Sequence, residues 1–183
     1  AKLSNDHNWI IQDGGFDNTC TTGDFITTWQ TSLGLDVITI PTTGTGYNYT
    51  VDWGDGNITT GHTGDAHHLY FLPYTYTIRI SGQFPRIFFN DLGDKDKILS
   101  VDQWGDNQWV SMNGAFKGCS NLEILASDSP DLSVVSDMSE MFSGCSSFNQ
   151  NIGNWNVSNV ENMAGLFHGA SSFNQDLSTW VTT

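Results

Sequence analysis

Residues 141–155 read MFSGCSSFNQNIGNW, and residues 166–180 read LFHGASSFNQDLSTW. Both segments place a Phe-x-Gly, the run Ser-Ser-Phe-Asn-Gln and a final Trp at the same spacing. An active site requires its residues once, whereas a segment that recurs at a fixed interval indicates a repeating architecture. These two segments therefore decide the fold of the C-terminal part of the chain.

The repeat extends upstream to a third copy. Met112, Met138 and Met163 occupy equivalent positions at intervals of 26 and 25 residues (138 − 112 and 163 − 138). A phenylalanine follows each methionine by four residues, and a glycine and a small residue come shortly after it. The positions that we expect to form the core of the repeats are Met112, Phe116, Met138, Phe142, Phe148, Met163, Phe167 and Phe173.

The length of the interval predicts how these copies pack. A unit of about 25 residues cannot bury its own apolar face, so neighbouring units must cover one another as the coils of a solenoid. The Met-x-x-x-Phe spacing favours a short helical turn that ends at the glycine. We expect Asn149 and Asn174 to form a ladder of amides that satisfies carbonyl groups of the turns.

The preceding region follows a β pattern instead. Apolar and polar residues alternate through DVITI (36–40) and YTYTIRISG (74–82), and segments rich in Gly and Asp separate such runs. One face of the second run is predicted to carry Tyr74, Tyr76, Ile78 and Ile80.

The chain thus divides into three predicted parts. Residues 1–23 form an extended arm with one apolar island, Trp9-Ile10-Ile11, residues 24–97 form a β-sandwich, and residues 98–183 form the solenoid. The predicted fold class is β-rich throughout.

Two sets of motifs resemble known families. VDWGDG at 51–56, followed by HLY at 68–70 and the YTYTIRISG strand, resembles a PKD-type, immunoglobulin-like sandwich. The segment MSEMFSGCSSFNQNIGNWNVSNVENM at 138–163 resembles the BspA-like leucine-rich repeats of bacterial surface proteins and lipoproteins. The second resemblance implies an exposed bacterial surface protein, linked in some members to adhesion, and it supplies no catalytic residues.

The composition restricts the classes of partner. Six Lys and Arg stand against 20 Asp and Glu, which gives a net charge of −14. This acidity argues against binding to nucleic acid or to an anionic membrane surface. No run approaches the ~18 apolar residues of a membrane span. The first residue is Ala1 rather than Met, as in a secreted protein whose signal peptide has been removed.

Two groups of residues carry side chains that can bind a metal ion. Asp52, Asp55 and Asn57 could offer oxygen ligands to calcium, although a turn built from Asp and Gly explains the same residues. His67 and His68 are neighbours on a predicted strand, so their side chains point to opposite faces and cannot easily share zinc. The resemblance to the PKD type instead implies a structural hydrogen bond for His68. No cofactor is expected apart from a calcium ion in the turn.

Catalysis is not expected. Cys119 and Cys145 each follow a glycine, but Ala170 fills the same repeat position, which predicts a buried small residue and not a nucleophile. Four tryptophans lie in or beside the repeats, and they either pack in the core or form an outward aromatic surface that stacks on sugars. They are Trp104, Trp109, Trp155 and Trp180.

The sequence therefore predicts a non-catalytic, secreted protein of a bacterial cell surface that adheres to a protein or glycan. One alternative is a structural subunit that assembles head-to-tail into an extracellular filament or layer, with Trp9, Ile10 and Ile11 against the last coil of a neighbouring copy. Another is an accessory targeting module of a secreted hydrolase.

Overall fold

The computed structural model describes residues 23–32 and 34–181. The predicted arm, with Trp9, Ile10 and Ile11, lies outside the described residues except for Gly23. The described residues are β-rich, contain no helix, and form eight strands. They are β1 (Phe25–Gln30), β2 (Asp36–Ile40), β3 (Asn48–Asp52), β4 (Ile58–His62), β5 (Ala66–Tyr70), β6 (Thr75–Gln83), β7 (Ile98–Gln103) and β8 (Glu123–Ile124).

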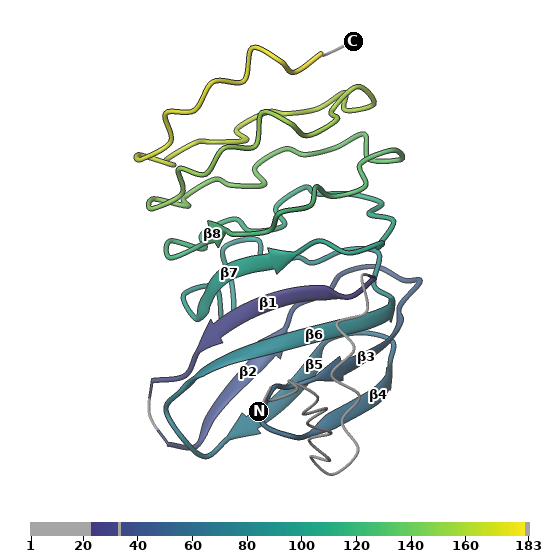
Figure 1. The fold of residues 1–183 in the computed structure, drawn as a ribbon, viewed down its shortest axis with the longest axis vertical. Coiled ribbons are helices and arrows are strands. Elements are labelled where there is room, and N and C mark those ends of the chain that lie inside the picture. Colours follow the sequence, from purple (N-terminus) through teal and green to yellow (C-terminus); the bar gives the residue numbers. More distant parts are fainter. Residues whose placement is uncertain (1–22, 33, 182–183) are drawn as a thin grey trace, which may run out of the picture.

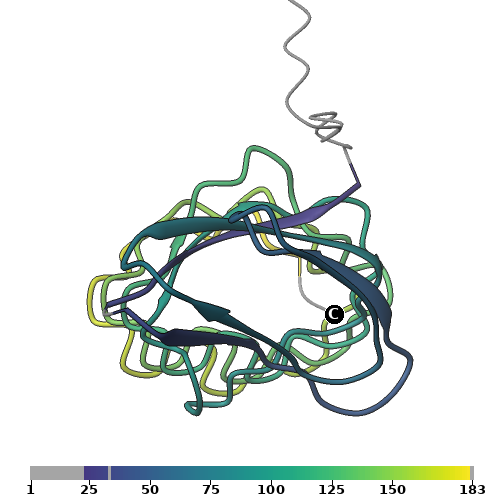
Figure 2. The same ribbon diagram turned by 90° about the horizontal axis from the view of Figure 1, so that it is seen from below.

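The strands form two sheets that enclose an apolar core. The larger sheet has the order β4-β3-β6-β1-β7-β8, and the smaller one pairs β2 with β5. All pairs are antiparallel except β7 with β8. Figure 2 shows the two sheets on opposite sides of the molecule, with the coils stacked behind them.

Alternation along the strands decides which residues fill this core. Ile38 and Ile40 of β2 face Ile78 and Ile80 of β6, and all four are buried. Of the four residues predicted to share one face, Tyr76, Ile78 and Ile80 are buried. Tyr74 precedes β6 and is 60% exposed, and its ring lies 6.5 Å from that of Tyr76. Its backbone continues the pairing of β1 with β6, since the N–H of Thr31 donates to the carbonyl of Tyr74 at 3.0 Å.

The larger sheet continues across the predicted boundary at residues 97 and 98. β7 follows that boundary and pairs with β1, while β8 adds to β7 from the repeat region. The buried apolar residues likewise form one cluster that runs from Phe25 to Leu166. The facing sheets and the repeats therefore share one hydrophobic core.

From β7 onward the chain winds into stacked coils (Figure 1). Backbone N–H groups of one coil donate to carbonyl groups of the next coil at every second residue. Gly114 donates to Ser139 at 2.9 Å and Phe116 to Met141 at 3.0 Å, and one coil further on Phe142 donates to Leu166 at 3.0 Å. The predicted helical turns are absent from the described residues, because these N–H groups pair between coils and not four residues back within one coil.

The repeated phenylalanines stack in two columns. Phe142 lies parallel to Phe116 and to Phe167, at centroid distances of 6.1 and 5.9 Å. The second column places Phe148 over Phe173 at 5.5 Å. The earlier copies are fully buried, whereas Met163, Phe167 and Phe173 in the last coil are partly buried. Each coil therefore covers the apolar face of its neighbour.

The asparagine ladder forms, but Asn149 accepts hydrogen bonds where the prediction had it donating to carbonyl groups. The amide oxygen of Asn149 accepts the backbone N–H of Asn174 at 2.8 Å and the side-chain amide of Gln175 at 3.0 Å. The amide therefore satisfies a backbone donor of the next coil and not a turn carbonyl.

Candidate functional site

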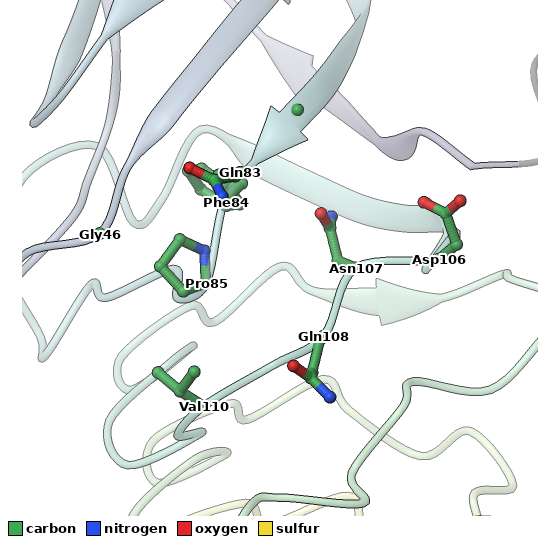
Figure 3. Close-up of a pocket in the computed structure, with 9 residues that line it drawn as sticks. Gly46, Gln83, Phe84, Pro85, Asp106, Asn107, Gln108 and Val110 are labelled. Carbon is green, nitrogen blue, oxygen red and sulfur yellow. The ribbon is translucent and has the colours of Figure 1, made fainter.

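A pocket of about 290 Å³ opens where the end of β6 meets residues 106–110 of the first, irregular coil (Figure 3). Its volume is close to the lower end of the ~300–1,000 Å³ range typical of small-molecule sites. The lining comes from three separate segments, Gly46, residues 82–85, and residues 106–108 with Val110. The pocket therefore exists only because the facing sheets and the coils are joined.

The polar lining consists of amides and one carboxylate. Gln83, Asn107 and Gln108 supply amides, and Asp106 supplies the carboxylate. In Figure 3 the side chain of Asn107 points toward the end of β6, whereas that of Gln108 points the other way. Asn107 is only 8% exposed, and its amide nitrogen has no hydrogen-bond partner among the described residues. A buried donor without an acceptor is unusual in a folded protein, so the Asn107 amide is a candidate to donate to a bound ligand.

The apolar part of the pocket is rigidly held. Phe84 is buried and packs edge-on against Tyr49 and Trp109, at centroid distances of 5.0 and 6.1 Å. The N–H of Val110 donates to the carbonyl of Pro85 at 3.0 Å, which ties the two walls together. The apolar wall of the pocket is therefore fixed by ring packing and by a backbone hydrogen bond.

Local backbone geometry fixes the position of Asp106. The preceding Gly105 has a φ of 67°, and a Cβ atom there would collide with the carbonyl groups of Gly23 and Asp24. Asp106 in turn donates its N–H to Gly23 at 3.1 Å. Only glycine fits this approach, so the two residues just before β1 hold the acidic side of the pocket in place.

Sequence reasoning missed this pocket. The polar run Gly105 to Gln108 departs from the repeat pattern, and that departure was the one available signal, since the other walls come from distant segments.

The residues expected to bind calcium belong to a hydrogen-bonded turn. Asp52 accepts the N–H of Gly54 at 3.0 Å, and Asp55 accepts the N–H of Asn57 at 3.1 Å and contacts the imidazole of His68 at 2.8 Å. Burial raises the pKa of Asp55, but hydrogen bonds from His68 and Asn57 outweigh burial and lower the pKa below its ordinary value. The described part of the chain holds no group of three or more His, Cys, Asp or Glu that could bind a metal ion. Hydrogen bonds within the turn and to His68 account for the positions of these carboxylates without an ion.

The two neighbouring histidines lie on opposite faces of β5. His67 meets the hydroxyl of Thr39 at 3.0 Å, whereas His68 stacks on Trp53 at a centroid distance of 5.0 Å. His68 therefore joins the β5 strand to the Trp53–Asn57 turn, which is the structural role that the resemblance implied.

Of the two alternatives for the four tryptophans, core packing and not an outward aromatic surface holds for three. Trp104 and Trp109 are fully buried, Trp155 is 4% exposed, and Trp180 is partly buried with its N–H donated to Ile152 at 3.1 Å. Trp104 packs edge-on against both Trp109 and Trp155, at 5.8 and 5.3 Å. The rings of these three buried tryptophans pack together where the sheets meet the coils, so they offer no outward face to a sugar.

The cysteines of the repeats are buried free thiols. Cys119 and Cys145 are both inaccessible, and the thiol of Cys145 lies 3.1 Å from the carbonyl oxygen of Phe116. Burial raises the pKa of Cys119 well above its ordinary value and that of Cys145 to about 12. Both thiols therefore stay protonated at neutral pH and pack as small apolar groups. Cys20 lies outside the described residues.

Comparison with known proteins adds one family. Residues 95–183 match the model of DUF285, described as a Mycoplasma protein of unknown function. The matched segment begins just before β7 and includes every coil of the stack. Neither a curated protein nor a solved structure matches the chain. In the part of the chain that the structure describes, no helix has the length and apolar character needed to cross a membrane.

Proposed function

We propose that this chain is a non-catalytic protein of a bacterial cell surface that adheres to other surfaces by binding a neutral glycan in the pocket beside β6. In this proposal the facing sheets are a PKD-type sandwich, and the stacked coils are a short leucine-rich-repeat solenoid of the BspA-like kind. The match of residues 95–183 to a Mycoplasma family supports a bacterial origin for the coils. The resemblance of the repeats to bacterial surface proteins supports an extracellular location.

The pocket is the observation on which this proposal rests. Amides both donate and accept hydrogen bonds, as sugar hydroxyl groups do, and a carboxylate such as Asp106 can accept from two hydroxyl groups at once. Pro85 and Val110 offer an apolar wall for the C–H face of a sugar ring.

Charge favours a neutral ligand. The net charge of −14, together with the carboxylate of Asp106 in the pocket wall, repels sulfated or sialylated glycans. A neutral oligosaccharide is not repelled by these charges.

The test is binding to an array of immobilised neutral and anionic oligosaccharides, followed by calorimetry with the strongest binder. We expect the double variant Gln83→Ala, Asp106→Ala to lose at least tenfold in affinity for a neutral oligosaccharide. Thr60→Ala, an exposed change on β4, serves as the matched control and should bind like the unaltered protein. Binding that the double variant leaves unchanged would remove the pocket from the proposal, and binding restricted to anionic glycans would contradict the charge argument.

Assembly into a filament has no described contact in its favour, because Trp9, Ile10 and Ile11 lie outside the described residues. The role of an accessory module of a hydrolase likewise has no observation that favours it.

A further inference from the structure

The two edges of the smaller sheet differ in how they are covered. On β2, the N–H of Thr39 donates to the carboxylate of Asp94 at 2.8 Å, and the carbonyl of Val37 accepts from the ammonium group of Lys97 at 2.6 Å. Lys97 also forms ion pairs with Asp36 and Asp94, both at 2.7 Å. Charged side chains therefore block the outer edge of β2, as natural sheets commonly require.

The register places free backbone groups on the other edge. Val37 and Thr39 lie opposite Leu69 and His67 of β5. Because Val37 and Thr39 direct their backbone groups away from β5, these are the non-hydrogen-bonded pairs of the antiparallel ladder. Leu69 and His67 must then direct their own N–H and C=O groups away from β2. Within the described residues, no hydrogen bond satisfies these four groups.

Apolar side chains surround this open edge. Leu69 is 41% exposed and lies directly opposite Val37, which is 40% exposed. The residues before β2 and after β5 extend the patch, because these two segments lie against each other. Gly34, before β2, is close to the backbone of Phe71, after β5, since a Cβ atom at Gly34 would lie 3.2 Å from the carbonyl oxygen of Phe71. The exposed members of this patch, which we call the β5 edge patch, are Leu35, Val37, Leu69, Phe71 and Leu72.

The other sheet ends in a strand that is less suited to pairing. β4 has a register shift against β3, and Gly61 in it has a φ of 74°. Such irregularities bend an edge strand and protect it from adding a further strand. β5 has a regular register with β2 over all five of its residues. Of the three edge strands β2, β4 and β5, only β5 therefore combines an open, regular edge with the apolar patch.

We propose that β5 binds an extended segment of a protein partner, which adds as a third strand to the β2–β5 sheet. The backbone of the partner pairs with the N–H and C=O groups of His67 and Leu69, and its apolar side chains, at alternate positions, cover the β5 edge patch. The net charge of −14 favours a segment flanked by basic residues and opposes a second copy of this chain. This site is separate from the pocket beside β6 and does not depend on glycan binding.

The experiment uses a defined peptide probe with the full chain. The probe is a nine-residue peptide of alternating valine and threonine with a lysine at each end. Its matched control carries N-methyl groups on alternate amides, which preserves the side chains and removes the backbone donors. Fluorescence polarisation measures binding, and amide hydrogen exchange followed by NMR reports on His67 and Leu69.

We expect the unmethylated peptide to bind and to slow exchange of the His67 and Leu69 amides at least tenfold, while the methylated peptide binds at least tenfold more weakly. Leu69→Lys should abolish binding of the probe. Thr60→Lys, the same charge placed on the edge strand β4, should leave it unchanged.

Three results would overturn the proposal. One is equal binding of the two peptides, which would reduce the site to a hydrophobic contact. Another is the absence of binding or of protection at the two amides. The last is protection of these amides that appears without peptide as protein concentration rises, which would make a second copy of the chain the occupant.

Discussion

Replacement of Phe142 by alanine tests the packing of the coils most directly. The ring is fully buried, and it contacts rings of both neighbouring coils, Phe116 at 6.1 Å and Phe167 at 5.9 Å, and Phe148 of its own coil at 4.2 Å. Removal of a fully buried phenylalanine ring loses its transfer free energy and leaves a cavity, so we expect Phe142→Ala to reduce the free energy of unfolding by about 3–5 kcal/mol. Urea denaturation followed by tryptophan fluorescence measures this loss, since Trp155 lies 6.1 Å from the Phe142 ring.

The same substitution one coil further on provides the control. Phe167 is only partly buried and lacks a described neighbour on its outer side, so Phe167→Ala should reduce the free energy of unfolding by roughly half as much, about 1.5–2.5 kcal/mol. Equal losses for the two variants, or a loss below about 1 kcal/mol for Phe142→Ala, would refute the argument that each coil is covered by the next.

Three further predictions concern a turn, an ion pair and the thiols. Gly105→Ala should reduce the free energy of unfolding by about 1–3 kcal/mol in urea melts, because its φ of 67° and the adjacent carbonyl groups exclude a Cβ atom. Asp55 has a lowered pKa when folded, so the stability that it contributes is complete above its unfolded pKa of about 4 and is lost as pH falls through the lower folded value. Asp55→Asn should therefore destabilise at pH 7, and the difference in melting temperature should vanish in acid. Cys119 and Cys145 should resist alkylation at pH 8 until denaturant is added, as judged by mass spectrometry of their peptides.

The sequence predicted those features of the coils that follow from the repeat interval. The interval of about 25 residues brings each phenylalanine over its counterpart, and the glycines that end the turns do adopt positive φ, at 82°, 76° and 73° for Gly118, Gly144 and Gly169. These features follow from identical residues at identical positions, so they need no knowledge of distant contacts.

The sequence did not predict features that depend on contacts with distant parts of the chain. An i, i+4 apolar pair fits a helical turn and a coil turn equally well, and only the hydrogen bonds between coils, such as Phe116 to Met141, decide between them. Similarly, the equivalence of Trp155 and Trp180 shows that both occupy one repeat position but not which way that position faces. The pocket was beyond prediction because Gln83 and Asn107 come together only through the junction of the sheets with the coils.

That junction also explains how the stack of coils begins. A stack of repeats ordinarily needs a cap, since its first coil would otherwise expose an apolar face and unpaired backbone groups. Here the segment after β6 takes the place of a preceding coil. The N–H groups of Phe89, Asn90 and Asp91 donate to the carbonyls of Ala115, Gly114 and Lys117, at 3.1, 3.0 and 2.9 Å.

The segment at 89–91 reaches this register by an unusual backbone. Asn90 and Asp91 both adopt positive φ, at 47° and 64°, which these two residue types tolerate better than most. The Phe89 ring lies 6.3 Å from that of Phe116 and thereby extends the phenylalanine column into the facing sheets. Since β7 also pairs with β1, strand β1 and the segment after β6 together supply the hydrogen bonds and the apolar surface that the first coil needs. The facing sheets therefore act as the N-terminal cap of the coils, and the pocket lies at the seam where cap and coils meet.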